Sequence, residues 1–139
     1  MTTIKEIMQI GVGMPDRESF ANFSRDMLGF PITASPDGRV TYIRPDRFQH
    51  RIAAPTAAAP VLNYIGLDVG GAGDLDEWKG KLATAGIDWR SGSREECLER
   101  HVADFIEFKD PDGHPLALSH GFEIDNEPVR YTRDLKMVG

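Results

Sequence analysis

An internal duplication limits the folds that are open to this chain. In the first half, residues 5–14 alternate as a β-strand does, and a helix follows with Asp16 as its cap and Gly29 at its carboxyl end. Three short extended runs then occupy residues 32–34, 40–43 and 51–54. The same order of elements returns from residue 61 onward. Two modules of one strand, one helix and three strands predict an α+β fold, in which the modules lie side by side and both helices are outside.

The second half repeats the pattern with its own helix signals. A strand is expected over residues 61–69, and a helix should begin at Asp74, with Glu77 as its capping-box partner, and stop at Gly86. Its further strands are expected at residues 87–90, 103–108 and 115–120. The stretch 53–60 holds two prolines and predicts a connector between the modules, because proline interrupts both helices and strand ladders.

Composition favours a single soluble domain of residues 1–121, built from modules 4–54 and 61–120. The chain has 139 residues, of which 40% are hydrophobic, and this is enough for one ordinary core. A net charge of −6 argues against nucleic acid or an anionic membrane as a partner. The one cysteine, Cys97, excludes a disulfide framework. We expect a cytoplasmic protein, since the sequence shows no secretory signal and no apolar run of membrane-spanning length.

The strand that opens each module has one large apolar face and one small or polar face. The apolar face, expected to pack on the helices, carries Met8, Ile10, Val12, Ile65, Leu67 and Val69. The opposite face carries Gln9, Gly11, Gly13, Tyr64, Gly66 and Asp68. The last strand repeats this division, with Leu116 and Leu118 toward the helix and Ala117 and Ser119 away from it. Eight strands of this kind predict a curved sheet around a ligand cleft with the helices outside, although such faces can also be merely solvated.

Three segments carry a resemblance to a known superfamily. They are residues 10–16 running into 23–30, residues 64–69, and the strand and turn of residues 108–116. In this order they resemble the vicinal oxygen chelate superfamily, which includes glyoxalase I, bleomycin resistance proteins and extradiol ring-cleaving dioxygenases. The resemblance covers residues 4–121 and implies two βαβββ modules.

The resemblance implies where a divalent metal would bind. Catalytic members commonly use histidine, histidine and glutamate, from the opening strand of each module and the last strand of the second. By position these ligands fall on Gln9, Tyr64 and Ala117. Tyrosine is a poor ligand at neutral pH and alanine offers no donor, so we expect no metal and no catalytic residue in this chain. The candidates for contact with a ligand in the cleft are Gln9, Tyr64, Ser119 and His120.

The nearest likeness is to the amino-terminal domain of two-domain extradiol dioxygenases of the 2,3-dihydroxybiphenyl type. In that family the amino-terminal domain lacks the metal ligands, and the carboxy-terminal domain holds Fe(II). Residues 122–139 resemble an extended interdomain linker or the start of a further repeat, since 134–139 resemble 4–8. We therefore expect the parent gene to continue with a histidine at the next position.

Two other functions stay open. The first is a metal-free binding protein of the bleomycin resistance type, which would hold an aromatic or cationic molecule in the cleft of a homodimer; the acidic net charge fits a cationic ligand. The second, a glyoxalase-like or epimerase enzyme that uses Gln9, requires further ligands that the sequence lacks. The expected partners are thus a small aromatic molecule and either a second copy or a covalently linked second domain.

Two further groups of residues have ordinary structural explanations. Cys97 and His101 are four apart, which predicts a solvated helical segment, and the acidic residues around them should raise the thiol pKa. The turn 110–113 contains two aspartates, a proline and a glycine, which predict a tight hairpin turn. It lacks the further spaced oxygen donors of a calcium loop.

Overall fold

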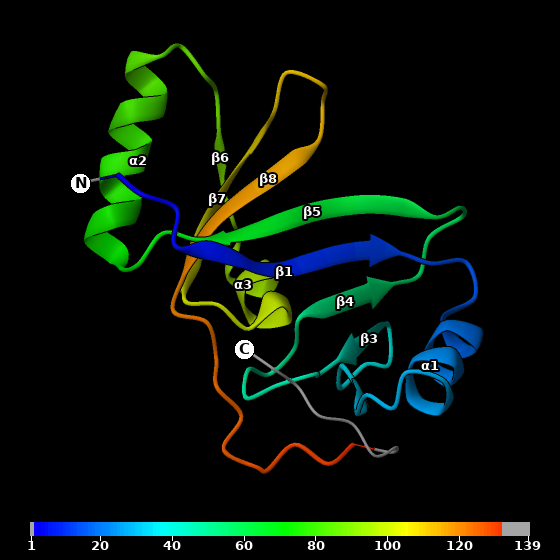
Figure 1. Cartoon of the computed structure of the whole chain (residues 1–139). Helices are drawn as coiled ribbons and strands as arrows, with labels where there is room; N and C mark the ends of the chain where they lie inside the picture. Colours follow the sequence, from blue (N-terminus) through cyan, green and yellow to red (C-terminus); the bar gives the residue numbers. More distant parts are fainter. Residues whose placement is uncertain (1, 132–139) are drawn as a thin grey trace. The chain divides into compact units, whose positions relative to one another are not determined.

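A computed structural model describes residues 2–131, which fall into two compact units (Figure 1). Among the described residues, unit 1 comprises 2–9 and 64–123, and unit 2 comprises 10–63 and 124–131. The predicted start of a further repeat at 134–139 lies outside the described residues. Within the described part, no helix is both long and apolar enough to cross a membrane.

The elements follow the predicted order, and the helical segment predicted around Cys97 is a short helix in the second module. They are β1 (Glu6–Gly13), α1 (Arg17–Asp26), β2 (Ile32–Ala34), β3 (Val40–Ile43), β4 (Ile52–Pro55), β5 (Val61–Asp68), α2 (Ala72–Thr84), β6 (Arg90–Ser91), α3 (Arg94–Arg100), β7 (Asp104–Lys109) and β8 (Pro115–His120). The hydrogen-bonded order of the strands is β2-β3-β4-β1-β5-β8-β7-β6. The pairs β1/β4 and β5/β8 are parallel, and the outer pairs of each module are antiparallel. The predicted α+β fold with an eight-stranded sheet is confirmed.

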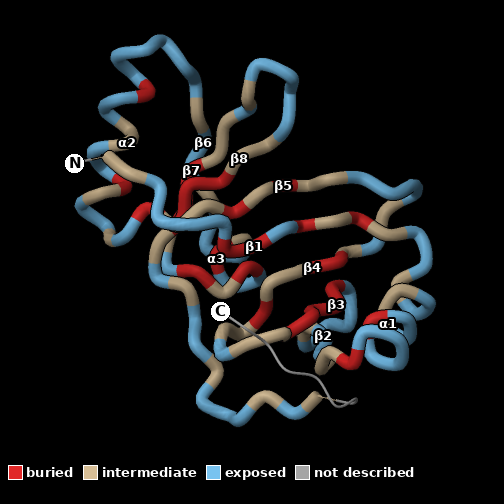
Figure 2. Tube along the Cα trace, in the orientation of Figure 1, coloured by how far each residue is buried: buried red, intermediate tan, exposed pale blue. Residues whose placement is uncertain are grey.

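In unit 2, α1 packs against β2 and β3. Asp16 caps the helix as predicted, because its carboxylate accepts a hydrogen bond of 3.0 Å from the Ser19 amide, and this bond lowers the pKa of Asp16. All four residues of β3 are buried, as the red trace of Figure 2 shows. Val40, Tyr42 and Ala53 form the apolar cluster of this unit.

The predicted connector is wrong at its beginning, because β4 extends to Pro55 and pairs with β3 there. Proline has no amide hydrogen, but its carbonyl still accepts a hydrogen bond of 2.9 Å from the Met14 amide. Position 55 therefore ends a strand instead of starting a loop.

In unit 1, α2 packs against β7 and β8. Its apolar cluster joins Val69, Leu75, Leu82, Ile106 and Leu118, with Leu67 and Trp78 beside them. The predicted helix-facing side of β5 and β8 is thereby confirmed for Leu67, Val69 and Leu118. The predicted start of α2 is wrong: Gly71 is the cap residue, and Asp74 lies in the first turn, where its carboxylate accepts from the Gly71 amide at 2.9 Å.

The small face of the opening strands is not open space. A side-chain carbon at Gly66 would lie 3.2 Å from Cβ of Gln9, and one at Gly13 would lie 2.8 Å from Cγ1 of Val61. These glycines therefore allow neighbouring strands to approach closely. Ile10, predicted to pack on a helix, is 37% exposed. Strand β6 also begins later than predicted, at Arg90.

Candidate functional site

The positions that would carry metal ligands all lie in unit 1, and all are buried. Gln9 is 4% exposed, Tyr64 is 5% exposed and Ala117 is fully buried. Strand register brings them together, since Gly66 of β5 lies beside Ala117 of β8, and Gly66 also contacts Gln9 of β1. One region of the sheet therefore holds these three positions.

The third ligand position has a carboxylate directly beside it. Glu107 of β7 lies opposite Ala117 of β8 in the antiparallel register, so both residues share one face of the sheet. This carboxylate is engaged by two arginines. Its Oε1 lies 3.3 Å from Nη2 of Arg100, and its Oε2 lies 3.0 Å from Nη2 of Arg90.

Helix α3 brings Arg100 to this face. Ser93 caps the helix, because its hydroxyl accepts from the Glu96 amide at 3.1 Å while the Glu96 carboxylate accepts from the Ser93 amide at 3.0 Å. The guanidinium carbon of Arg100 lies 3.7 Å from the ring centre of Tyr64 and 4.1 Å from that of Phe105. These are cation–π contacts of a side chain that is only 10% exposed.

Backbone and side chain of Arg100 both contact the ligand positions. Its carbonyl oxygen accepts a hydrogen bond of 2.8 Å from Nε2 of Gln9. The same residue thus contacts Gln9 through its backbone and Tyr64 through its guanidinium. Sequence reasoning missed Arg100, which is the organising residue of this region.

The charges around Arg100 balance one another. Arg90 lies 2.8 Å from Glu96 and 3.0 Å from Glu107, and Arg100 is paired with Glu107 and, at 3.9 Å, with Glu96. The hydrogen bonds from Arg90 lower the pKa of Glu96 to about 2. In turn, the hydrogen bond to Glu96 raises the pKa of Arg90. Two guanidinium groups and two carboxylates therefore form a closed ionic cluster.

Tyr64 is held as a neutral phenol. Burial raises its pKa to about 12, and the charge of Arg100 offsets only part of that effect. Within the described residues, neither the Tyr64 hydroxyl nor Nη1 of Arg100 has a hydrogen-bond partner, although both atoms are buried. A phenol that keeps its proton is a weak metal ligand.

These residues do not fit a divalent metal ion. Ala117 offers no donor atom, Tyr64 is neutral, and the amide nitrogen of Gln9 donates to Arg100. A guanidinium lies against the same positions and supplies positive charge there. The chemistry available at this face is packing and ion pairing.

The remaining cleft candidates lie on β8. Ser119 is 2% exposed, and its hydroxyl lies 3.5 Å from the carbonyl oxygen of Ala117. His120 ends the strand, is partly buried, and lies opposite Asp104 of β7. No contact of these two residues indicates a ligand, so their role in a cleft stays a prediction.

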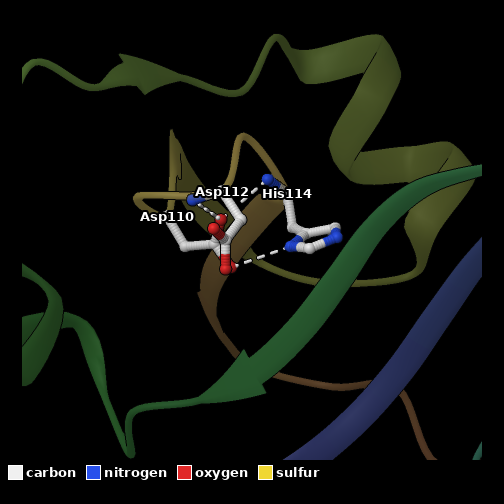
Figure 3. A group of neighbouring side chains, drawn as sticks. All are labelled: Asp110, Asp112 and His114. Atoms are coloured by element: carbon white, nitrogen blue, oxygen red, sulfur yellow. Dashed lines mark hydrogen bonds and ion pairs between the residues drawn. The ribbon is translucent and has the colours of Figure 1, made fainter.

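A second group of potential metal ligands lies in the turn between β7 and β8 (Figure 3). Among the described residues, Asp110, Asp112 and His114 are the three acidic, histidine or cysteine residues close enough to share an ion. The Asp110 carboxylate accepts from the amides of Asp112 and His114, at 2.9 Å and 2.8 Å, and lies 3.0 Å from Nδ1 of His114. The hydrogen bond from the His114 backbone amide lowers the pKa of Asp110. Both carboxylate oxygens hold the turn together, as the residue types predict.

Cys97 is not the solvated residue that its acidic neighbours suggest. The segment is helical, but Cys97 is 8% exposed and packs with Tyr64, Val102, Phe105 and Ala117. Burial raises the pKa of its thiol, and Asp104 adds to this. A thiol with a raised pKa is a poor nucleophile, so Cys97 belongs to the core.

In comparisons with known proteins, the chain is similar to several dioxygenases. No model of a protein family matches the sequence. The sequence is 26% identical over 125 residues to a biphenyl-2,3-diol 1,2-dioxygenase of Sphingomonas paucimobilis. These matched residues are 90% of this chain and 42% of that protein. It is 24% identical over 127 residues to an iron-dependent extradiol dioxygenase of Rhodococcus jostii, covering 91% and 42%. A crystal structure of a catechol 2,3-dioxygenase matches with a TM-score of 0.91 and 26% identity, over 97% of this chain and 45% of that chain. The chain thus spans less than half the length of the relatives that it matches.

Proposed function

Because this chain is homologous to the extradiol dioxygenases and has their vicinal oxygen chelate fold, we propose that it is the non-catalytic amino-terminal domain of an iron-dependent ring-cleaving dioxygenase. The observation that carries the proposal is the position of Arg100. Its guanidinium lies against Tyr64, where the resemblance would put a metal ligand. The domain therefore contributes a packed ionic core in place of a metal centre.

In this proposal, iron and the reacting substrate belong to a carboxy-terminal domain. The substrate class is a catechol or dihydroxybiphenyl, in keeping with the relatives' names. The role of this chain is structural: it shapes the enzyme assembly, either as a linked domain or in a homo-oligomer, in the cytoplasm.

The proposal is tested by comparing ring cleavage by this chain with ring cleavage by the longer protein from the same gene. Each is supplied anaerobically with Fe(II) and then mixed with oxygenated catechol or 2,3-dihydroxybiphenyl. We expect the yellow ring-cleavage product from the longer protein only. Ring cleavage by this chain alone would refute the assignment, and a gene that ends at residue 139 would refute the two-domain arrangement.

The second candidate is a metal-free binding protein that acts as a homodimer. The net charge of −6 favours a cationic aromatic ligand for such a protein. A calorimetric titration of the chain with bleomycin distinguishes this function from the first proposal. A structural domain of a dioxygenase is not expected to bind bleomycin. Saturable binding with one site per chain would favour the second candidate.

A further inference from the structure

The segment Ile124–Tyr131, called the strap below, follows the last strand and belongs to unit 2. It makes three contacts with the loop of residues 44–48, two through its backbone and one through the hydroxyl of Tyr131. Ile124 forms an antiparallel bridge with Phe48, the Asp125 amide donates to the Arg47 carbonyl at 2.9 Å, and the Tyr131 hydroxyl donates to the Pro45 carbonyl at 2.8 Å. The strap is therefore held to the loop at both of its ends.

Arg44 is the centre of this docking. Its side chain is 8% exposed, and its Nη2 donates to the carbonyl oxygens of Asp125 and Glu127, at 3.1 Å and 2.6 Å. Its Nε donates to the carbonyl of Phe48 at 3.2 Å, and its Nη1 lies 3.6 Å from the Asp125 carboxylate. One guanidinium thus joins the loop to two backbone carbonyls of the strap.

This arrangement depends on the shape of arginine. A guanidinium presents several donors in a fixed plane, whereas a lysine ammonium is a point charge on a flexible stem. A lysine at position 44 could meet the Asp125 carboxylate but could not hold the carbonyls of Asp125, Glu127 and Phe48 together. Departure of the strap would also break the hydrogen bonds from Arg44 to the carbonyls of Asp125 and Glu127, which is costly.

We infer that Arg44 is a positioning residue that fixes the strap to unit 2. The strap therefore follows a defined path over unit 2 as far as Tyr131, whose hydroxyl donates to the Pro45 carbonyl. Where the chain continues into a second domain, the segment that leads toward it is anchored to the 44–48 loop as far as Tyr131; this consequence alone rests on the proposed function.

Hydrogen exchange on the complete chain tests the inference. Arg44→Lys should speed amide exchange across residues 124–131 by at least about tenfold, which corresponds to about 1.4 kcal/mol, while β7 and β8 exchange as in the unaltered protein. Arg39→Lys is the matched control, because Arg39 is 78% exposed and pairs with Asp37 in the same unit. Unchanged exchange of the strap in Arg44→Lys would overturn the inference.

A second variant keeps the test decisive if Arg44→Lys unfolds unit 2, which faster exchange throughout β3 would reveal. Tyr131→Phe removes only the hydroxyl that donates to Pro45. We expect faster exchange over residues 129–131 with β3 unaffected, and no change there would overturn the inference. Since neither measurement uses iron or substrate, the outcome is independent of the dioxygenase assignment.

Discussion

Replacing Arg100 by methionine removes the centre of the ionic cluster while keeping most of the apolar stem. The two cation–π contacts, 3.7 Å from the centre of Tyr64 and 4.1 Å from that of Phe105, contribute about 1 kcal/mol each. The charged hydrogen bond to Glu107, at 3.3 Å, contributes about 1 kcal/mol more. Arg90 still pairs with Glu107, so that carboxylate is not left alone. The free energy of unfolding should therefore fall by about 3 kcal/mol.

Urea denaturation of Arg100→Met at neutral pH measures this loss. The matched control is Arg25→Met on α1, where the arginine is 44% exposed and pairs with an exposed aspartate; its loss should stay within about 0.5 kcal/mol. Arg100→Lys should recover only part of the stability, because an ammonium does not stack on both rings. A loss below about 1 kcal/mol for Arg100→Met would refute the reasoning, since that is typical of a surface pair.

Two further predictions concern pH and close packing. The lowered pKa of Glu96, about 2 against an ordinary 4.5, means that its ionised form stabilises the folded state; this stabilisation is complete above pH 4.5 and is lost as the pH falls toward 2. Glu96→Gln should therefore lose less stability than the unaltered protein between pH 5 and 2, and parallel urea midpoints would contradict this. Gly121 has φ of +70°, and an added Cβ would lie 2.4 Å from Cβ of Ala103. Gly121→Ala should cost about 2–4 kcal/mol, whereas Gly38→Ala, at φ +74° with open space around it, should cost about 1 kcal/mol; equal losses in thermal denaturation would contradict the packing argument.

The order of the elements could be predicted because each signal is local. The Asp16 cap and the glycine at position 29, which has φ of +79°, act within one helical turn. The start of α2 was harder, because Asp74 suits the cap position and the first turn equally well. Gly71 takes the cap position instead, and a glycine gives no side-chain signal there.

The burial of the small strand face could not be predicted from alternation alone. Alternation divides a strand into two faces, but it does not show what covers each of them. Gly66 predicts an open face, yet the neighbouring strand places Gln9 against it. That contact depends on register between strands far apart in the sequence.

The contacts of Arg100 could not be predicted either, because they join parts of the chain that are far apart in the sequence. In the sequence it lies four residues after Glu96, a spacing typical of a solvated ion pair on a helix surface. Its contacts with Tyr64 and Phe105 arise only when α3 packs on the sheet. The sequence shows that position 117 is an alanine, which has no carboxylate. It does not show that the guanidinium of Arg100 lies against Tyr64.

We expect that Gln9, Tyr64 and Ala117, the positions where the resemblance would put metal ligands, bind no metal. The most direct measurement is the iron content of the purified chain after anaerobic incubation with excess Fe(II) and removal of the unbound metal. We expect no more iron than an unrelated protein retains in the same procedure. One tightly held iron per chain, lost on substitution of Gln9 by leucine, would contradict it.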